Sequence, residues 1–167
     1  MAIFVTDGKV GVNLTQVRTS AQGPEFAKGT KVKTSDGGDA VYCQSTSGVS
    51  TYNGVVIGVD YTLQGLATAN VADGSGSGKQ VGWCQTSIAP SSYGWVQVSG
   101  RPKGKLASAC ADRVTLYTTT TVGVMDDATI SAALVAGVVS KTTISNATAV
   151  TLMVPDGAHI HPHANPA

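Results

Sequence analysis

The chain alternates short apolar segments with clusters of Gly, Asp, Asn and Ser through most of its length. Short segments rich in Val, Ile, Thr, Tyr and Trp, bounded by turn-forming residues, are typical of β-strands. In residues 93–98 alternate side chains face opposite ways, with Trp95 and Gln97 on one side and Val96 and Val98 on the other. We expect strands over residues 31–34, 39–46, 54–61, 79–88, 93–98, 106–110, 114–118, 134–139 and 148–154.

The two ends of the chain lack this pattern. Residues 1–25 hold few large apolar groups, and residues 155–167 are polar and rich in Pro. We expect an extended N-terminal arm, a β domain over residues 26–154, and a flexible C-terminal tail. The fold class is mainly β: a single compact β-barrel, β-tulip or sandwich domain. Only residues 126–134 could form a helical turn or two, with acidic residues at its start.

Composition narrows the function. Charged residues make up 13% of the chain, and 11 Lys+Arg against 10 Asp+Glu give a formal charge of +1. Nucleic-acid binding needs a concentration of cations, so we expect no nucleic-acid partner. The cluster at residues 101–105 (RPKGK) is broken by Pro and Gly and is interpreted as a solvated turn, with a contact to phosphate or to an acidic partner as the alternative.

The start of the chain lacks the cationic and apolar regions of a secretory signal, and no apolar run is long enough for a membrane helix. We therefore expect synthesis in a cytoplasm and no membrane contact. The weakly charged surface suits a protein that packs against copies of itself or against a larger lattice.

Three cysteines, Cys43, Cys84 and Cys110, are far apart in the sequence and form no CxxC pair. The simplest interpretation is three buried thiols. The alternative is a disulfide, within one chain or between subunits, formed after release into an oxidising medium.

No catalytic constellation emerges from the sequence. The stretch at residues 73–79 (DGSGSGK) lacks the first Gly and the final Ser or Thr of a phosphate-binding loop, and a strand is expected after it instead of a helix. No Ser has the flanking glycines of a nucleophile elbow. The acidic pairs, Asp36 with Asp39 and Asp126 with Asp127, lie in turn contexts, where Asp is favoured for structural reasons. We expect neither enzymatic activity nor a cofactor.

All three histidines lie near the C-terminus, at His159, His161 and His163. In an extended chain their imidazoles share one face, which is a geometry that can chelate a divalent transition metal. The alternative is a polar tail whose histidines alternate by chance. These residues are weak metal candidates only.

Trp83 and Trp95 lie on strands expected to be adjacent. Such a pair most often belongs to a core. If exposed, these possible surface aromatics would form a platform on which sugar rings stack.

Residues 81–100 (VGWCQTSIAPSSYGWVQVSG) resemble a strand-and-hairpin pattern of structural proteins in tailed phages, and the continuation over residues 107–110, 114–121, 123–127 and 136–139 fits the same pattern. The chain is thus similar to the decoration (cement) proteins that coat phage heads, over residues 28–140. The resemblance implies a virion protein, made in the bacterial host cytoplasm. It would bind the outer surface of the mature capsid and bridge neighbouring subunits of the major capsid protein, often as a homotrimer.

The expected attachment device is the N-terminal arm, where Ile3, Phe4 and Val5 can add a strand to an exposed capsid edge. The alternative function is a glycan- or host-surface-binding module of a head fibre or tail, which would use Trp83 and Trp95.

Overall fold

The computed structural model describes residues 4–6, 9–71, 79–128, 133–141 and 148–161 of the chain. Within these ranges the secondary structure consists of strands and one 3₁₀ turn, Thr68–Asn70, so the expected mainly-β fold is confirmed. No helix in this part of the chain is long and apolar enough to cross a membrane. The strands are β1 (Phe4–Thr6), β2 (Lys9–Gly11), β3 (Val17–Arg18), β4 (Lys31–Lys33), β5 (Asp39–Ser45), β6 (Gly54–Ile57), β7 (Thr62–Gly65), β8 (Gln80–Cys84), β9 (Tyr93–Gln97), β10 (Lys103–Leu106), β11 (Thr115–Thr118), β12 (Val124–Asp126), β13 (Leu134–Ser140), β14 (Thr148–Met153) and β15 (Ala158–His161).

Five consecutive strands, β5 to β9, close into a small barrel that we call the first barrel. Around the ring the order is β5, β7, β6, β8, β9, with β9 pairing back to β5. The β5–β7 pair is parallel and the other four are antiparallel. Closure gives every strand of the ring a partner on both sides, and β5, β8 and β9 each pair over part of their length with one further strand, β4, β15 and β3 respectively.

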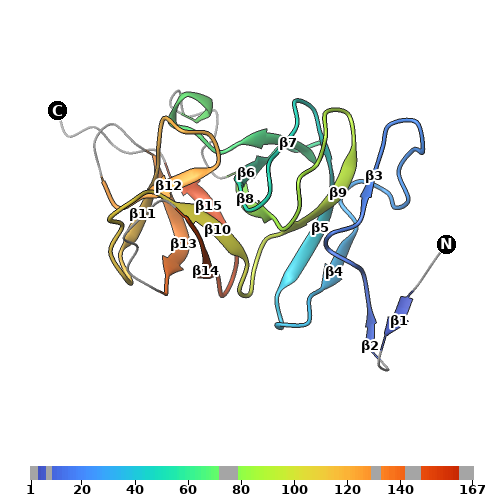
Figure 1. Cartoon of the computed structure of the whole chain (residues 1–167), viewed down its shortest axis with the longest axis horizontal. Coiled ribbons are helices and arrows are strands. Elements are labelled where there is room, and N and C mark those ends of the chain that lie inside the picture. The colour runs from blue at the N-terminus through green and yellow to red at the C-terminus, as the bar shows by residue number, and fades with distance from the viewer. Residues whose placement is uncertain (1–3, 7–8, 72–78, 129–132, 142–147, 162–167) are drawn as a thin grey trace.

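The next five strands, β10 to β14, repeat this connectivity and form the second barrel. The order is β10, β12, β11, β13, β14, with β14 pairing back to β10. Here too the first and third strands of the unit form the parallel pair. Each strand of the second barrel therefore corresponds to the strand five positions earlier in the chain. Figure 1 shows the two units side by side along the long axis.

Strand β15 joins the two barrels into one continuous sheet. It lies antiparallel between β13 and β8, which hold equivalent positions in their barrels. Ala158 and Ile160 point inward and are buried, while His159 and His161 are exposed. The predicted tail boundary at residue 155 is therefore wrong: the chain turns at residues 155–157 and then adds a strand whose period of two the polar composition had masked.

The interior of the first barrel is one hydrophobic cluster, made of Val41, Cys43, Val49, Val55, Ile57, Leu63, Cys84, Ile88, Val96 and Val98. The cluster inside the second barrel also takes in side chains from the outside of the first, namely Val56, Val81 and Trp83. The barrels thus share a core where they meet, and Trp83 lies in it with no exposed surface.

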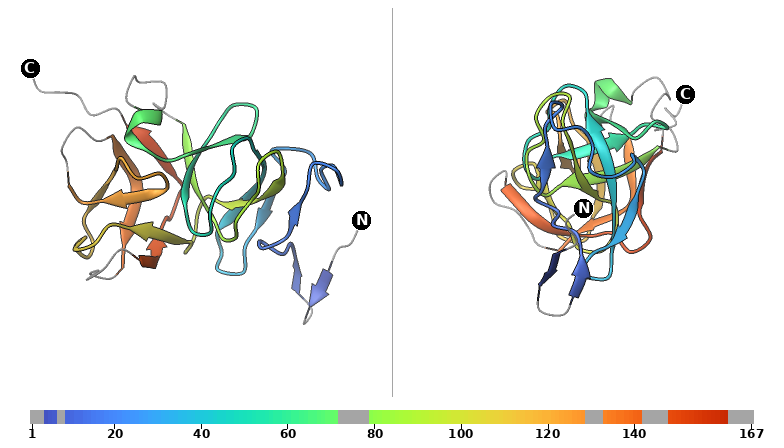
Figure 2. Two further views of the ribbon diagram at one scale, coloured as in Figure 1. Left: turned by 45° about the horizontal axis from the view of Figure 1, so that its top comes forward. Right: turned by 90° about the vertical axis from the view of Figure 1, so that its right-hand side faces the viewer.

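The predicted N-terminal arm has two parts. Residues 12–26 run along the outside of the first barrel, where β3 pairs with β9. Before them, β1 and β2 form a separate two-stranded hairpin. Figures 1 and 2 show this hairpin standing away from the barrels at one end of the molecule.

Several local expectations need correction. The strand expected over residues 106–110 lies earlier, as β10, and residues 107–110 form a turn. Residues 58–61 form a turn instead of extending the strand, with the Tyr61 amide donating to the Gly58 carbonyl at 3.0 Å. Residues 103–105 lie in strand β10, and so only the start of the basic cluster is a turn. The expected helical turn begins inside strand β12 and ends at strand β13, while its middle lies outside the described residues.

Candidate functional site

The predicted capsid-binding residues fall on the N-terminal hairpin. Phe4 and Val5 lie in β1, where they pair with Gly11 and Val10, and Ile3 lies outside the described residues. The arm was predicted as an unpaired segment, whereas β1 is paired on one side with β2. Each strand of a two-stranded hairpin still has one edge without a strand partner in the described part of the chain. Such an edge can accept or extend a sheet.

An aromatic cluster fixes the segment behind the hairpin to the first barrel. Phe26 packs on Trp95 with ring centroids 5.2 Å apart, and edge-on against Tyr42 at 5.4 Å. The Glu25 amide donates to the Tyr42 hydroxyl at 3.3 Å, and Arg18 pairs with Glu25 at 3.5 Å. Burial raises the pKa of the Tyr42 hydroxyl. These contacts attach residues 18–26 to the first barrel.

Trp83 and Trp95 are not surface aromatics, so the exposed-platform interpretation is wrong and the core interpretation is confirmed. Trp83 has 0% and Trp95 1% of its surface exposed. Both project from the outside of the first barrel, but the second barrel covers Trp83 and the N-terminal segment covers Trp95. The alternation of residues 93–98 was predicted correctly. What covers the outward face depends on distant parts of the chain.

The histidines that the structure describes lie together on β15. The Nε2 atoms of His159 and His161 are 3.0 Å apart, and both side chains are exposed. The expectation that alternate histidines share one face holds for this pair. His163 lies outside the described residues.

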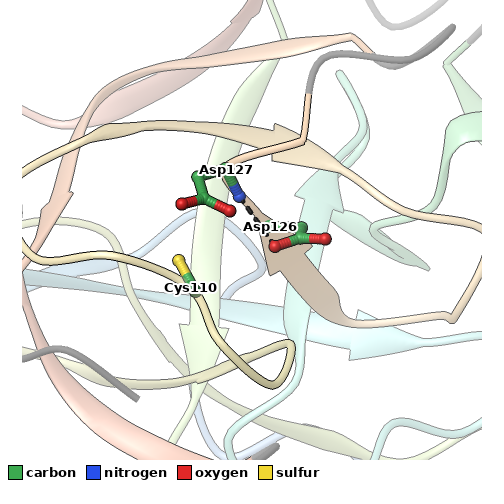
Figure 3. Close-up of side chains that lie close together, drawn as sticks. All are labelled: Cys110, Asp126 and Asp127. Atoms are coloured by element: carbon green, nitrogen blue, oxygen red, sulfur yellow. Dashed lines mark hydrogen bonds between the residues drawn. The ribbon is translucent and has the colours of Figure 1, made fainter. Parts of the chain in front are cut away.

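A second group of potential metal ligands brings Cys110, Asp126 and Asp127 within 4.8 Å of one another (Figure 3). Asp127 accepts a hydrogen bond from the Ala111 amide at 3.0 Å, and Asp126 accepts one from the Asp127 amide at 2.9 Å. Burial, followed by the nearby carboxylates, raises the pKa of the Cys110 thiol to about 11, so this thiol is protonated at neutral pH. Burial also raises the pKa of Asp126. The group closes a loop against the end of β12, as expected of Asp in a turn.

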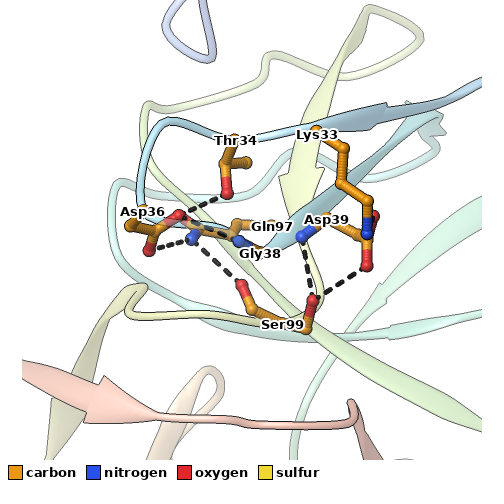
Figure 4. A network of polar contacts seen from close by, with 7 residues as sticks. All are labelled: Lys33, Thr34, Asp36, Gly38, Asp39, Gln97 and Ser99. Carbon is orange, nitrogen blue, oxygen red and sulfur yellow. Dashed lines mark hydrogen bonds and ion pairs between the residues drawn. The ribbon is translucent and has the colours of Figure 1, made fainter.

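The other acidic pair, Asp36 and Asp39, bonds to the linker between the barrels, residues 98–102, and to the end of β9 (Figure 4). Asp36 accepts hydrogen bonds from the Gln97 amide group at 2.9 Å and from the Arg101 backbone amide at 2.6 Å. Ser99 accepts from the Asp39 amide at 2.8 Å and donates to its carboxylate at 3.2 Å. Both carboxylates are therefore structural.

The pKa of Asp36 reflects two opposing effects. Burial by itself would raise the pKa, but hydrogen bonds from Thr34, the Arg101 and Gly38 amides and Gln97 outweigh it, so the pKa lies below its ordinary value. The pKa of Asp39 is also lowered, first by its hydrogen bond with Lys33.

The cysteines are three buried, free thiols, as predicted. Cys43 and Cys84 point into the first barrel, where burial raises the pKa of Cys43 to about 12 and that of Cys84 further. A nucleophilic cysteine needs a lowered pKa. The geometry thus gives these thiols a packing role.

An open groove of about 500 Å³ follows the outer side of β13. Its lining is mostly apolar, with Leu134, Ala136, Val139, Met153 and Pro155 among its residues, and Asp156 is its one titratable residue. A hydrolytic site brings together a nucleophile, a base and an oxyanion donor, and this groove does not group such residues.

Comparison with known proteins gives no assignment. No family model matches the chain, and no curated protein matches it significantly.

Proposed function

We propose that this chain is a structural protein of a tailed-phage virion that binds the outer surface of the mature capsid. In that position it bridges neighbouring subunits of the major capsid protein and stabilises the expanded lattice. Because it would bind only the assembled state, each bound copy shifts the equilibrium toward that state by mass action. The observation that carries this proposal is the hairpin β1–β2, which stands apart from two otherwise closed barrels.

The closure of the two rings limits which strand edges can pair with another protein. Each barrel strand has a partner on both sides within its ring, so the free strand edges in the described part of the chain lie on the hairpin and on the short outer strands β3 and β4. The hairpin has backbone groups available at its outer edges, and strand addition supplies affinity through main-chain hydrogen bonds. A rigid body with a projecting hairpin suits a clamp between two neighbours.

The strand pair in the phage-like segment supports the same proposal. Residues 80–84 and 93–97 form β8 and β9, which pair through Trp83 with Gln97 and Cys84 with Val96. The resemblance therefore falls on strands that build the first barrel and its contact with the second. It concerns the scaffold, while the hairpin is the part we assign to attachment.

A homotrimer is the assembly we propose on the capsid. Weak contacts repeated by symmetry add to a high total affinity without a large interface for each copy. The low charge of the chain, with a formal net charge of +1, permits such close packing.

The alternative function, a glycan-binding module of a fibre or tail, cannot use the two residues proposed for it. Trp83 and Trp95 are buried, so sugar rings cannot stack on them without unfolding part of the chain. Glycan recognition would need other residues, and no observation singles them out.

The structure permits a sharper truncation than removal of the whole arm. Deleting residues 1–11 removes the hairpin but keeps Val12, Leu14 and β3, which contact the first barrel. We expect the full chain to co-sediment with expanded capsids that lack a decoration protein, and the truncated chain to remain in the supernatant. A chain without residues 162–167 is the matched control and should co-sediment normally.

Tryptophan fluorescence verifies folding in each variant, because both tryptophans lie in packed clusters. Binding by the chain without residues 1–11 would overturn the role of the hairpin. Failure of the full chain to bind any expanded capsid would overturn the proposed function.

A further inference from the structure

Strand β15 carries a preformed pair of imidazoles. We propose that His159 and His161 form a bidentate binding site for a divalent transition-metal ion, with Cu²⁺ and Ni²⁺ preferred. The site is independent of the capsid contact proposed above, because it uses β15 and not the N-terminal hairpin.

The distance between the two nitrogens matches a particular coordination angle. With metal–nitrogen bonds of about 2.0 to 2.1 Å, two ligands at a right angle lie about 2.8 to 3.0 Å apart, whereas the tetrahedral angle requires about 3.3 to 3.4 Å. The Nε2 atoms of His159 and His161 are 3.0 Å apart. This separation is compatible with adjacent positions in the tetragonal geometry of Cu²⁺ and Ni²⁺, and the preference for Cu²⁺ follows from the higher affinity of imidazole sites for Cu²⁺ than for Zn²⁺.

The backbone beneath the pair is held on both sides. His161 lies opposite Leu134 and His159 opposite Ala136 on β13, while on the other side His159 lies opposite Gln80 of β8. The intervening Ile160 is buried with 1% of its surface exposed, and Ala158 is buried before it. Only side-chain torsions remain to be fixed when an ion binds, which keeps the entropic cost of binding low.

The pair is open to solvent on its outer face. Both imidazoles are exposed, and their neighbours Leu134 and Ala136 line the groove along β13. Two protein ligands leave the other coordination positions of the ion for water or for a ligand from outside the chain. An ion bound here is therefore exchangeable and accessible.

An ion that binds both rings replaces the contact between them. In the unbound pair the two Nε2 atoms lie at hydrogen-bond distance, with the donor set by the tautomer. Metal binding needs both Nε2 lone pairs, so the donating ring takes the tautomer with its proton on Nδ1. Metal binding involves no oxidation and no bond cleavage.

The test is isothermal titration of the full chain with NiCl₂ and with CuCl₂, alongside the variants His159→Gln, His161→Gln and His163→Ala. Chelation makes the second bond intramolecular, so loss of either ring of the pair should weaken binding about 100-fold. His163→Ala should leave the affinity close to that of the unchanged chain. The electron paramagnetic resonance spectrum of bound Cu²⁺ should show two nitrogen ligands from the full chain and one nitrogen ligand from either Gln variant.

The variants change exposed side chains, and circular dichroism verifies that each one is folded. The proposal is overturned if the full chain shows no saturable binding of either ion. It is equally overturned if the Gln variants bind as tightly as the full chain, or if His163→Ala weakens binding as much as His161→Gln does.

Discussion

The two barrels share one strand order but cover their equivalent outer faces differently. In the first barrel the outer face of β5 and β9 carries Tyr42 opposite Trp95, and the N-terminal segment packs over both. In the second barrel the equivalent strands β10 and β14 present Lys103 opposite Thr151 and Lys105 opposite Ala149. The two lysines reach Tyr52 and Asn53 of the first barrel.

This difference separates what the strand order specifies from what the individual side chains specify. The same ring closes over a Val- and Cys-rich interior in one case and around Leu106, Leu116 and Met125 in the other. The side chains on the outer face of each barrel then determine which other part of the chain packs against that face. The aromatic face packs against the arm that carries the hairpin, and the lysine-bearing face contacts Tyr52 and Asn53 of the other barrel.

The largest expected effect comes from the shared core between the barrels. We expect Trp83→Ala to lower the free energy of unfolding by about 3 to 5 kcal/mol, because a buried aromatic ring is lost from both barrels at once. Chemical denaturation monitored by circular dichroism measures the change. Trp83→Phe is the matched control and should cost far less, since the indole Nε1 has no hydrogen-bond partner in the described part of the chain. Equal stability of the Ala variant and the unchanged chain would contradict a shared core.

The next largest effect is expected at Gly104 of β10, which lies directly against Trp83. A Cβ atom added there would be 2.5 Å from Leu152 Cδ1 and 2.8 Å from Trp83 Cδ1. We expect Gly104→Ala to cost about 1 to 3 kcal/mol through overpacking, measured by thermal unfolding. In a Leu152→Ala background the added cost should shrink, because one of the two clashing groups is gone. An unchanged cost in that background would contradict the proposed contact.

A smaller effect is expected for the linker network at Asp36. Asp36→Asn should cost about 1 to 1.5 kcal/mol at neutral pH, because its carboxylate accepts from Gln97 and from the Arg101 amide. Asp60→Asn is the control, since Asp60 is exposed and, among the described residues, its side chain accepts hydrogen bonds from Thr62, two residues along the chain. A larger loss for Asp60→Asn than for Asp36→Asn would contradict this assignment.

The lowered pKa of Asp36 also predicts that the free energy of unfolding depends on pH. The pKa of Asp36 is lower in the folded chain than its ordinary value, so the folded state releases this proton more readily than the unfolded state. The stabilising contribution of the Asp36 carboxylate is fully present at a pH above the ordinary pKa of Asp, about 4. It is lost as the pH falls through the lower pKa of the folded state. Unfolding measured across this acidic range should show a smaller loss of stability in Asp36→Asn than in the unchanged chain.

The smallest effect is expected on the lysine-bearing face. Lys103 places its ammonium 5.6 Å from the centroid of the Tyr52 ring. Because the contact is exposed to solvent, Lys103→Ala should cost about 0.5 kcal/mol, measured by denaturant titration. A loss as large as that of Trp83→Ala would mean that the lysine face, not the shared core, holds the barrels together.

Local pattern predicted most of the strands and their facing, and it included a barrel among three possible architectures, but it did not predict which strands close the ring. The alternation at Trp95 and Val96 follows from sequence spacing alone. The repeat of the barrel was not predicted, because the equivalent pairs Tyr42–Trp95 and Lys105–Ala149 share no chemistry. Short segments such as β12 become strands because neighbouring strands pair with them, and their own residues give little local signal.

The candidate sites divide in the same way. The three buried thiols follow from composition and spacing. Burial of Trp83 depends on a second barrel that only the tertiary structure reveals. The pairing of His159 with His161 depends on β15, where a turn at residues 155–157 precedes a strand that the polar composition of the tail obscured.

The most direct test of the proposed function is the imaging of expanded capsids, lacking any decoration protein, after incubation with the full chain. We predict added density at discrete, symmetry-related positions on the outer surface, with the hairpin of each copy in contact with a major capsid protein subunit. Capsids without added density at saturating concentrations, or density that persists after residues 1–11 are removed, would contradict the account.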